Sequence, residues 1–269
     1  MSIEETAADC ETVNVSMGDR VEKVATIELY RPDARNALNA QLRQELKQVL
    51  EEVPDSGLRA LVLTGAKDSG AFVAGADVNE LRERNALEQR EASKRPRVYE
   101  CVDDCPMPVI ARINGHALGG GCELIQACDL RIAHEDAKIG QPEINLGIMP
   151  GGGGTQRLPR LVGEGHAMRL ILTGELIDAE EAADIGLVDE VYGDDGFDDR
   201  VYDLAAAIAE KSPVALEFAK KSVKAASRMD LETGIEYEAE LFAQLFATGD
   251  KNEGIDAFFE DRDPEWPSG

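Results

Sequence analysis

Apolar and polar positions follow two different periods in the first part of the chain. Residues 24–30 alternate apolar and polar side chains, which is typical of a β-strand. Apolar residues three and four positions apart predict a helix over 38–53, and 78–91 is a charged segment with helical character. Short apolar runs that indicate further strands lie at 60–63, 109–113 and 130–133. The repeated order of strand, loop and helix predicts an α/β fold.

The pattern changes near residue 195, where strand signals stop. Asp178 and Glu181 form a capping signal ahead of a helix that Gly186 ends, and the chain after residue 197 carries helical spacing. We therefore predict three parts. They are an acidic flexible tail over 1–12, an α/β core with the functional site over 13–195, and a helical region over 196–269.

The chain is strongly acidic, with 53 Asp and Glu residues against 28 Lys and Arg residues and a formal net charge of -25. Because nucleic acids are polyanions, this charge argues against a nucleic-acid partner. No apolar run approaches the roughly 18 residues of a membrane span, and residues 1–12 are too polar for a secretory signal. We expect a cytoplasmic protein with no membrane partner. The scattered acidic residues indicate a surface adapted to a high-salt, halophilic cytoplasm.

Metal-binding and common cofactor motifs are missing from the sequence. The five cysteines are odd in number and lack a paired C-x-x-C spacing, so we expect reduced thiols and no metal site. The histidines, His116, His134 and His166, are not spaced to act together, and the acidic run at 194–203 lacks the EF-hand spacing. No P-loop, G-x-G-x-x-G, G-x-S-x-G or H-E-x-x-H sequence occurs.

Three consecutive glycines at 119–121 stand at a predicted strand-to-helix junction. Such glycines let backbone N–H groups face a bound oxyanion, although a simple tight turn is the open alternative. Glu123 follows in the first helical turn, where the helix dipole favours the ionised carboxylate by roughly 0.3 to 1 kcal/mol. Glu143 follows Pro142 in an irregular segment, where an acidic residue is usually exposed. Local sequence thus favours Glu123 as a base and leaves Glu143 without a role.

Several ordered motifs resemble the enoyl-CoA hydratase (crotonase) family. They are NALN (36–39), AFVAGAD (71–77), PVIARINGHALGGGCE (108–123), GQPEINLG (140–147) and PGGGGTQRL (150–158). The resemblance runs from about residue 24 to the C-terminus. It implies the crotonase (ClpP/crotonase-like) α/β fold, a spiral of ββα units with two nearly perpendicular sheets and a helical C-terminal oligomerisation region.

The resemblance also implies an activity, which is the reversible syn addition of water to a trans-2-enoyl-CoA to give a 3-hydroxyacyl-CoA in fatty-acid or related acyl-CoA catabolism. The backbone N–H groups of Ala76 and Gly120 would hold the thioester oxygen, and Glu123 and Glu143 would grip a water molecule. The helix dipole assigns Glu123 as the base and leaves Glu143 as the acid. Further substrate contacts are expected at Ala74, Gly75, Asp77, Leu118, Gly119 and Gly147. No cofactor is implied, because CoA is part of the substrate.

Some alternatives stay open beside this interpretation. An enoyl-CoA isomerase of the same family and a non-catalytic acyl-CoA-binding subunit both fit. Some relatives bind RNA, but this chain offers only a short basic cluster at Lys220, Lys221, Lys224 and Arg228. Family members are commonly homotrimers or dimers of trimers. The apolar residues that fit such an assembly are Leu241, Phe242, Leu245, Phe246, Phe258 and Phe259.

The chain departs from the family where CoA phosphates are held. Family hydratases often carry lysine at two positions that are Asn79 and Asp261 in this chain, so positive charge is lost at both. The cations left for the role are Arg82, Arg84 and Arg262, and the sequence does not choose between these and bound cations.

Molar KCl should raise the melting temperature above its value in dilute buffer, because salt screens repulsion among the acidic side chains. Thermal unfolding followed by circular dichroism in both solutions checks this. An unchanged melting temperature would remove the high-salt interpretation.

Overall fold

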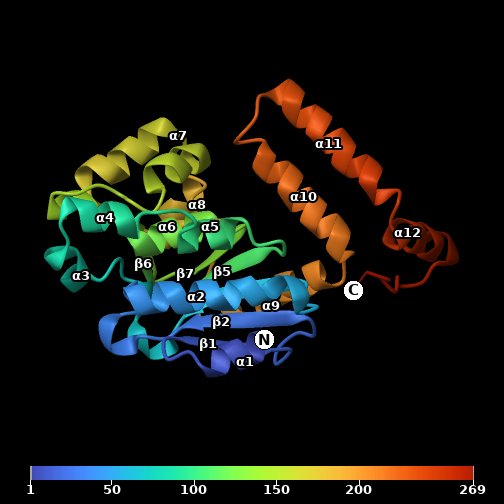
Figure 1. The fold of residues 1–269 in the computed structure, drawn as a ribbon, viewed down its shortest axis with the longest axis horizontal. Helices are drawn as coiled ribbons and strands as arrows, with labels where there is room; N and C mark the ends of the chain where they lie inside the picture. Colours follow the sequence, from blue (N-terminus) through green and yellow to red (C-terminus); the bar gives the residue numbers. More distant parts are fainter. Residues whose placement is uncertain (1, 269) are drawn as a thin grey trace.

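Two β-sheets form the centre of the molecule, and the computed structural model describes residues 2–268 (Figure 1). The larger sheet has the order β1-β2-β3-β5-β7-β10 and the smaller has β4-β6-β8-β9. The strands of the larger sheet are β1 (Val13–Met17), β2 (Val24–Leu29), β3 (Ala60–Gly65), β5 (Val109–Ile113), β7 (Leu130–His134) and β10 (Glu190–Tyr192). Those of the smaller sheet are β4 (Ala71–Val73), β6 (His116–Leu118), β8 (Lys138–Gly140) and β9 (Leu176–Asp178). β1 with β2 and β8 with β9 are antiparallel pairs, and the other neighbours are parallel.

Consecutive strands alternate between the two sheets. β3, β5 and β7 lie in the larger sheet, and the strand that follows each of them, β4, β6 or β8, lies in the smaller one. Helices then lead to the next unit, with α3 (Val78–Glu83) after β4, α6 (Gly120–Ala127) after β6 and α7 (Gly154–Thr173) after β8. The chain thus advances by one strand in each sheet per unit, which confirms the predicted spiral of ββα units.

The larger sheet is covered on both faces. α2 (Ala40–Glu52) packs with Leu61 and Leu63 on one face, and α9 (Phe197–Ala209) packs with Ala60 and Val62 on the other. All six positions of β3 are therefore buried. The boundary predicted near residue 195 lies one helix too early, because α9 completes the core of this sheet.

The first residues form a packed helix, contrary to the predicted flexible tail. α1 (Ile3–Ala8) begins with a capping box between Ser2 and Glu5, and the side chain of Ile3 is 2% exposed in the main core. One buried apolar residue fixes this short helix against α2 and β1. An acidic composition gives no sign of such a contact.

The segment over the site is also more divided than its sequence indicates. The loop predicted at 70–77 contains β4, and the helix predicted at 78–91 is two helices, α3 and α4 (Ala86–Ala92). Arg84 is extended (φ -81°, ψ 133°) and Asn85 caps α4. Neither helix has a buried residue, so together they form an outer wall. The remaining helices before α9 are α5 (Val98–Asp103) and α8 (Ala179–Asp184), the latter capped by Asp178 as predicted.

The last three helices lead away from the sheets (Figure 1). They are α10 (Pro213–Ala225), α11 (Leu231–Leu245) and α12 (Gly249–Glu260). Lys220 pairs with Asp129 (2.7 Å), and Lys224 pairs with both Asp103 (2.6 Å) and Asp129 (2.9 Å). Two lysines of the basic cluster therefore anchor α10 to the core.

The outer helices carry an exposed apolar surface. Large apolar side chains that are at least half exposed are Val223, Leu231, Ile235, Phe242, Phe246, Phe258 and Phe259. Leu241, which the sequence assigned to this surface, is instead 8% exposed. Between residues 2 and 268 no helix combines the length and apolar character that a membrane crossing requires.

Candidate active site

Three loops meet at one edge of the smaller sheet. Because β4, β6 and β8 are neighbours and run parallel, their carboxyl ends share that edge. Ala76 follows β4, Glu123 lies in the first turn of α6 after β6, and Glu143 lies in a 3-10 helix, η4 (Pro142–Leu146), after β8. The edge borders a cavity of about 770 Å³, a usual size for a small-molecule site.

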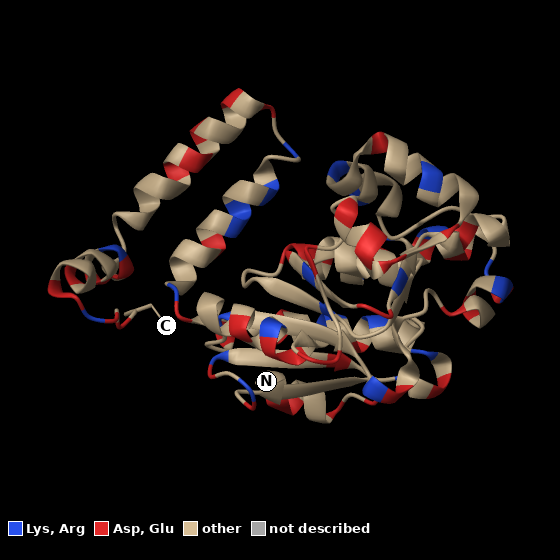
Figure 2. Cartoon of the chain, turned by 180° about the vertical axis from the view of Figure 1, so that it is seen from behind, with Lys and Arg blue, Asp and Glu red and all other residues tan. Residues whose placement is uncertain are grey.

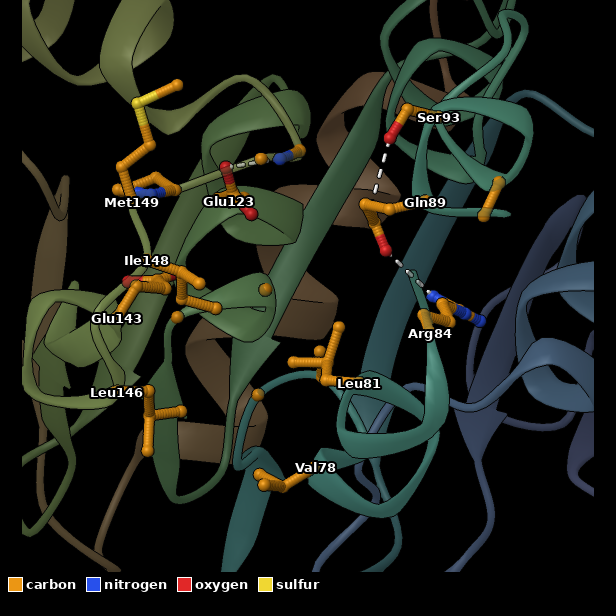
Figure 3. A pocket seen from close by; sticks show the side chains of 18 of the residues that line it. Val78, Leu81, Arg84, Gln89, Ser93, Glu123, Glu143, Leu146, Ile148 and Met149 are labelled. Carbon is orange, nitrogen blue, oxygen red and sulfur yellow. Dashed lines mark hydrogen bonds between the residues drawn. The ribbon is translucent and has the colours of Figure 1, made fainter. Parts of the chain in front are cut away.

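Apolar and polar side chains both line the cavity (Figure 3). Labelled apolar side chains are Leu146, Ile148 and Met149. Among the polar ones, Arg84 Nη1 donates to Gln89 Oε1 (3.3 Å), and Gln89 Nε2 donates to Ser93 Oγ (3.1 Å). This polar row belongs to the outer wall built by α3 and α4.

Glu123 is fixed by the second glycine stretch of the sequence. Its side chain is 3% exposed, and Oε1 accepts hydrogen bonds from the N–H groups of Gly152 (2.6 Å) and Gly154 (2.8 Å). A Cβ on Gly152 would lie 2.6 Å from Oε2 of Glu123 and 2.4 Å from ring carbons of Tyr99, so only glycine fits there. The second oxygen, Oε2, accepts no hydrogen bond from residues 2–268.

Burial raises the pKa of Glu123, and the two backbone N–H groups together with Arg97 and Arg157 oppose that effect. The direction is opposite to the one that the helix dipole alone predicts. Sequence reasoning missed the effect of burial on this pKa, because nothing near Glu123 in the chain reveals that the start of α7 closes over it.

Glu143 lines the same cavity as Glu123 but has a different environment. Burial and the charge of Glu123 raise the pKa of Glu143 to about 7. Gly119, at φ 51°, makes room for the carboxyl, since a Cβ there would lie 3.0 Å from Glu143 Oε1. With its amide oriented to satisfy its neighbours, buried Gln141 donates to both Glu143 oxygens (3.1 and 3.0 Å) and accepts from Gln126 (3.0 Å). Glu143 is thus positioned from both sides.

The two N–H groups expected to hold an oxyanion lie on adjacent loops. Gly120 begins α6, so its N–H has no acceptor within that helix. Leu38 brackets the other loop, donating to Gly75 O (2.8 Å) and accepting from Asp77 N (3.0 Å), which leaves the N–H of Ala76 outside this ladder. A Cβ on Gly120 would lie 3.5 Å from Ala76 N. Both groups line the cavity.

The structure divides the other expected substrate contacts into two groups. Ala74, Gly75 and Gly119 line the cavity. The other three are outside its lining and have structural contacts. Asp77 caps α3 and pairs with Arg31 (3.1 Å), Leu118 belongs to β6, and Gly147 ends η4 in a left-handed conformation (φ 73°).

Sequence reasoning missed several residues of the site. Tyr99 and Arg97 line the cavity from α5 and its start, and Arg43 lines it from α2. Arg97 binds Glu100 and donates to Gly151 O (2.5 Å), so it ties α5 to the glycine stretch. Only the glycines had a sequence signal, because PGGGG was among the motifs. Isolated residues such as Tyr99 have no motif that could reveal them.

The candidates for holding the CoA phosphates are separated in space. Arg84 lines the cavity and pairs with Glu80 (2.8 Å), which also pairs with Arg43 (2.8 Å). Arg262 instead pairs with Glu253 (2.6 Å) beside α12, and Asp261 ends that helix. Within residues 2–268 no three His, Cys, Asp or Glu side chains are arranged to hold a metal ion.

Known proteins are similar to this chain in both sequence and fold. Residues 19–269 match the family model of enoyl-CoA hydratase/isomerase. A short-chain-enoyl-CoA hydratase of Clostridium acetobutylicum is 42% identical over 89% of this chain and 92% of its own length. A crotonyl-CoA hydratase of Syntrophomonas wolfei is 42% identical over 91% and 94%, respectively. The crystal structure of an enoyl-CoA hydratase from Bacillus anthracis superimposes with a TM-score of 0.91 at 39% identity, over 96% of this chain and all of that one.

These similarities extend over the whole architecture that holds the cavity. The chain belongs to the enoyl-CoA hydratase/isomerase family, and its fold is the crotonase fold.

Proposed function

We propose that this protein is an enoyl-CoA hydratase that adds water to a trans-2-enoyl-CoA, with Glu123 as the base and Glu143 as the acid. The observation that carries the proposal is the pair of carboxyl groups on one cavity with the N–H groups of Ala76 and Gly120 beside them. Relatives named as short-chain and crotonyl-CoA hydratases support hydration as the reaction. The family model also includes isomerases, and comparing 2-enoyl with 3-enoyl thioesters separates the two activities.

The order of groups along the cavity gives the substrate a direction. The thioester oxygen lies at Ala76 and Gly120, and the carboxyl groups reach the next two carbons of the acyl chain. The acyl tail then continues beyond Glu123, toward Met149 and Ser93 in Figure 3. The thioester sulfur and the CoA attached to it extend in the opposite direction, past Val78. Acyl chain length is therefore decided where the lining from α4 meets the apolar part of the lining.

The two carboxyl groups divide the proton transfers. Two N–H groups on Oε1 favour the anion of Glu123, and its free Oε2 takes a proton from water as the oxygen attacks the β-carbon. Glu143, with a pKa of about 7, delivers a proton to the α-carbon. The N–H groups stabilise the negative charge that gathers on the thioester oxygen. Both hydrogens and the oxygen of one water molecule are accounted for, because Glu123 gains one proton and Glu143 loses one. A proton then passes from Glu123 back to Glu143 to restore the starting state, and no cofactor is needed.

Glu123→Gln and Glu143→Gln should each lower kcat for hydration of crotonyl-CoA by roughly 10²- to 10⁴-fold, because each amide keeps the shape but cannot transfer the proton. Loss of the conjugated absorbance measures the rate. Glu22→Gln, in the exposed turn between β1 and β2, is the matched control and should keep full activity. Near-wild-type turnover in either site variant would contradict the assigned roles.

The rate of hydration should fall as pH rises through about 7. Glu143 must carry a proton to act as the acid, and its raised pKa places the loss of that proton near neutrality. A profile of kcat/KM against pH measures the macroscopic value of the coupled pair. The residual activity of Glu143→Gln should lack this descending limb, and a limb that persists there would assign the titration to another group.

We also propose a homotrimer or a dimer of trimers. The exposed apolar surface of α11 and α12 supports assembly, since Phe242 is 61% exposed and Phe258 and Phe259 are each 80% exposed. Size-exclusion chromatography with light scattering should give a mass that is a multiple of three chains. A double change of Phe258 and Phe259 to Asp should weaken assembly, whereas Leu87→Asp, at an isolated exposed leucine, should not. A monomeric wild-type chain would contradict the proposal.

A cytoplasmic, high-salt setting is part of the same proposal. Acidic side chains are spread over the body and over α11 in Figure 2, so the net charge of -25 is a property of the whole surface. Such a surface stays soluble in concentrated salt, where its self-repulsion is screened.

A further inference from the structure

Tyr99 places a hydroxyl group in the cavity without a protein partner. Its side chain is 7% exposed and lines the cavity from α5. The hydroxyl groups of Tyr192 and Tyr202 have hydrogen bonds, to Glu190 (2.8 Å) and Thr26 (2.9 Å), whereas that of Tyr99 has none within residues 2–268. The hydroxyl is therefore free to form a hydrogen bond with a molecule bound in the cavity.

The hydroxyl lies beside the loops that carry the two expected oxyanion donors. A Cβ on Gly120 would lie 3.0 Å from Tyr99 Oη, 3.3 Å from Leu38 Cδ1 and 3.5 Å from Ala76 N, so the hydroxyl and Ala76 N border the same small space beside Gly120. The ring cannot withdraw from it, because it packs directly on Gly152, which holds Glu123. Tyr99 is thus fixed by the same glycine that orients the base.

Burial, with a contribution from nearby carboxylates, keeps this hydroxyl protonated. Burial raises the pKa of Tyr99, and the nearby carboxylates of Glu123 and Glu143 raise it further, outweighing the opposite effect of Arg43 and Arg97. A neutral phenol can donate a hydrogen bond to a developing oxyanion without carrying charge into the site.

We propose that Tyr99 is a catalytic residue that donates a third hydrogen bond to the thioester oxygen, beside the N–H groups of Ala76 and Gly120. The inference rests on the proposed hydration of enoyl-CoA. Its hydrogen bond strengthens as the carbonyl oxygen gains negative charge, so it lowers the barrier more than it improves substrate binding.

Tyr99→Phe removes only the hydroxyl and keeps the ring on Gly152. It should lower kcat for crotonyl-CoA about 100-fold, which is the lower end of the range for loss of one oxyanion donor. KM should be nearly unchanged. Tyr202→Phe is the matched control, since that hydroxyl bonds to Thr26 on the larger sheet, and it should keep wild-type kinetics. Equal melting temperatures for Tyr99→Phe and wild type establish that the variant is folded.

A second measurement is independent of turnover. Acetoacetyl-CoA ionises to an enolate that resembles the charged intermediate, and its enolate absorbance reports binding. Tyr99→Phe should bind this enolate at least tenfold more weakly than wild type, because one donor to its oxygen is gone. If the wild-type protein hydrates no crotonyl-CoA, the proposed function is refuted. Binding of the acetoacetyl-CoA enolate then still tests whether Tyr99 donates to the oxygen.

Three results would overturn the role of Tyr99. One is a kcat for Tyr99→Phe within threefold of wild type. Another is an increase in KM at constant kcat, which would make the hydroxyl a ground-state contact. The third is an unchanged affinity for the enolate of acetoacetyl-CoA.

Discussion

The carboxylate of Glu123 is tied to the backbone of a distant segment, and the rest of the site is arranged around this contact. Oε1 accepts from the N–H groups of Gly152 (2.6 Å) and Gly154 (2.8 Å), which fixes the start of α7 against α6. The same contact turns Oε2 toward the cavity and requires a glycine at 152, on which the ring of Tyr99 then packs. Glu123, the glycine stretch and Tyr99 therefore form one packed unit, in which none of the three can move alone.

The location of this unit follows from the topology of the smaller sheet. Parallel neighbours end at the same edge, so the loops after β4, β6 and β8 converge although they are far apart in sequence. Convergence buries two carboxyl groups in one cavity, and burial raises the pKa of both. Burial thus raises the pKa of Glu143 to about 7, whereas backbone N–H groups oppose the same effect at Glu123.

Some cations of this acidic chain pair with carboxylates that are largely shielded from solvent. Lys220 and Lys224 neutralise Asp129 between α10 and the core, and Arg97 neutralises Glu100 beside the cavity. These ion pairs matter because a carboxylate left unpaired away from water would be destabilising. Two lysines of the basic cluster visible in the sequence, Lys220 and Lys224, belong to these ion pairs.

The sequence by itself determined the ββα order, the helical C-terminal part and the glycine turn before Glu123, because apolar period, capping residues and glycine spacing are local properties. Its family resemblance pointed to Glu143, which no local feature singles out. Only the tertiary structure decided that Ile3 packs in the core, that α9 belongs to the sheet and that the hydroxyl of Tyr99 lies beside Gly120. Each of these depends on which segments meet in space, and the burial that sets the pKa of Glu123 and Glu143 depends on the same meeting of segments.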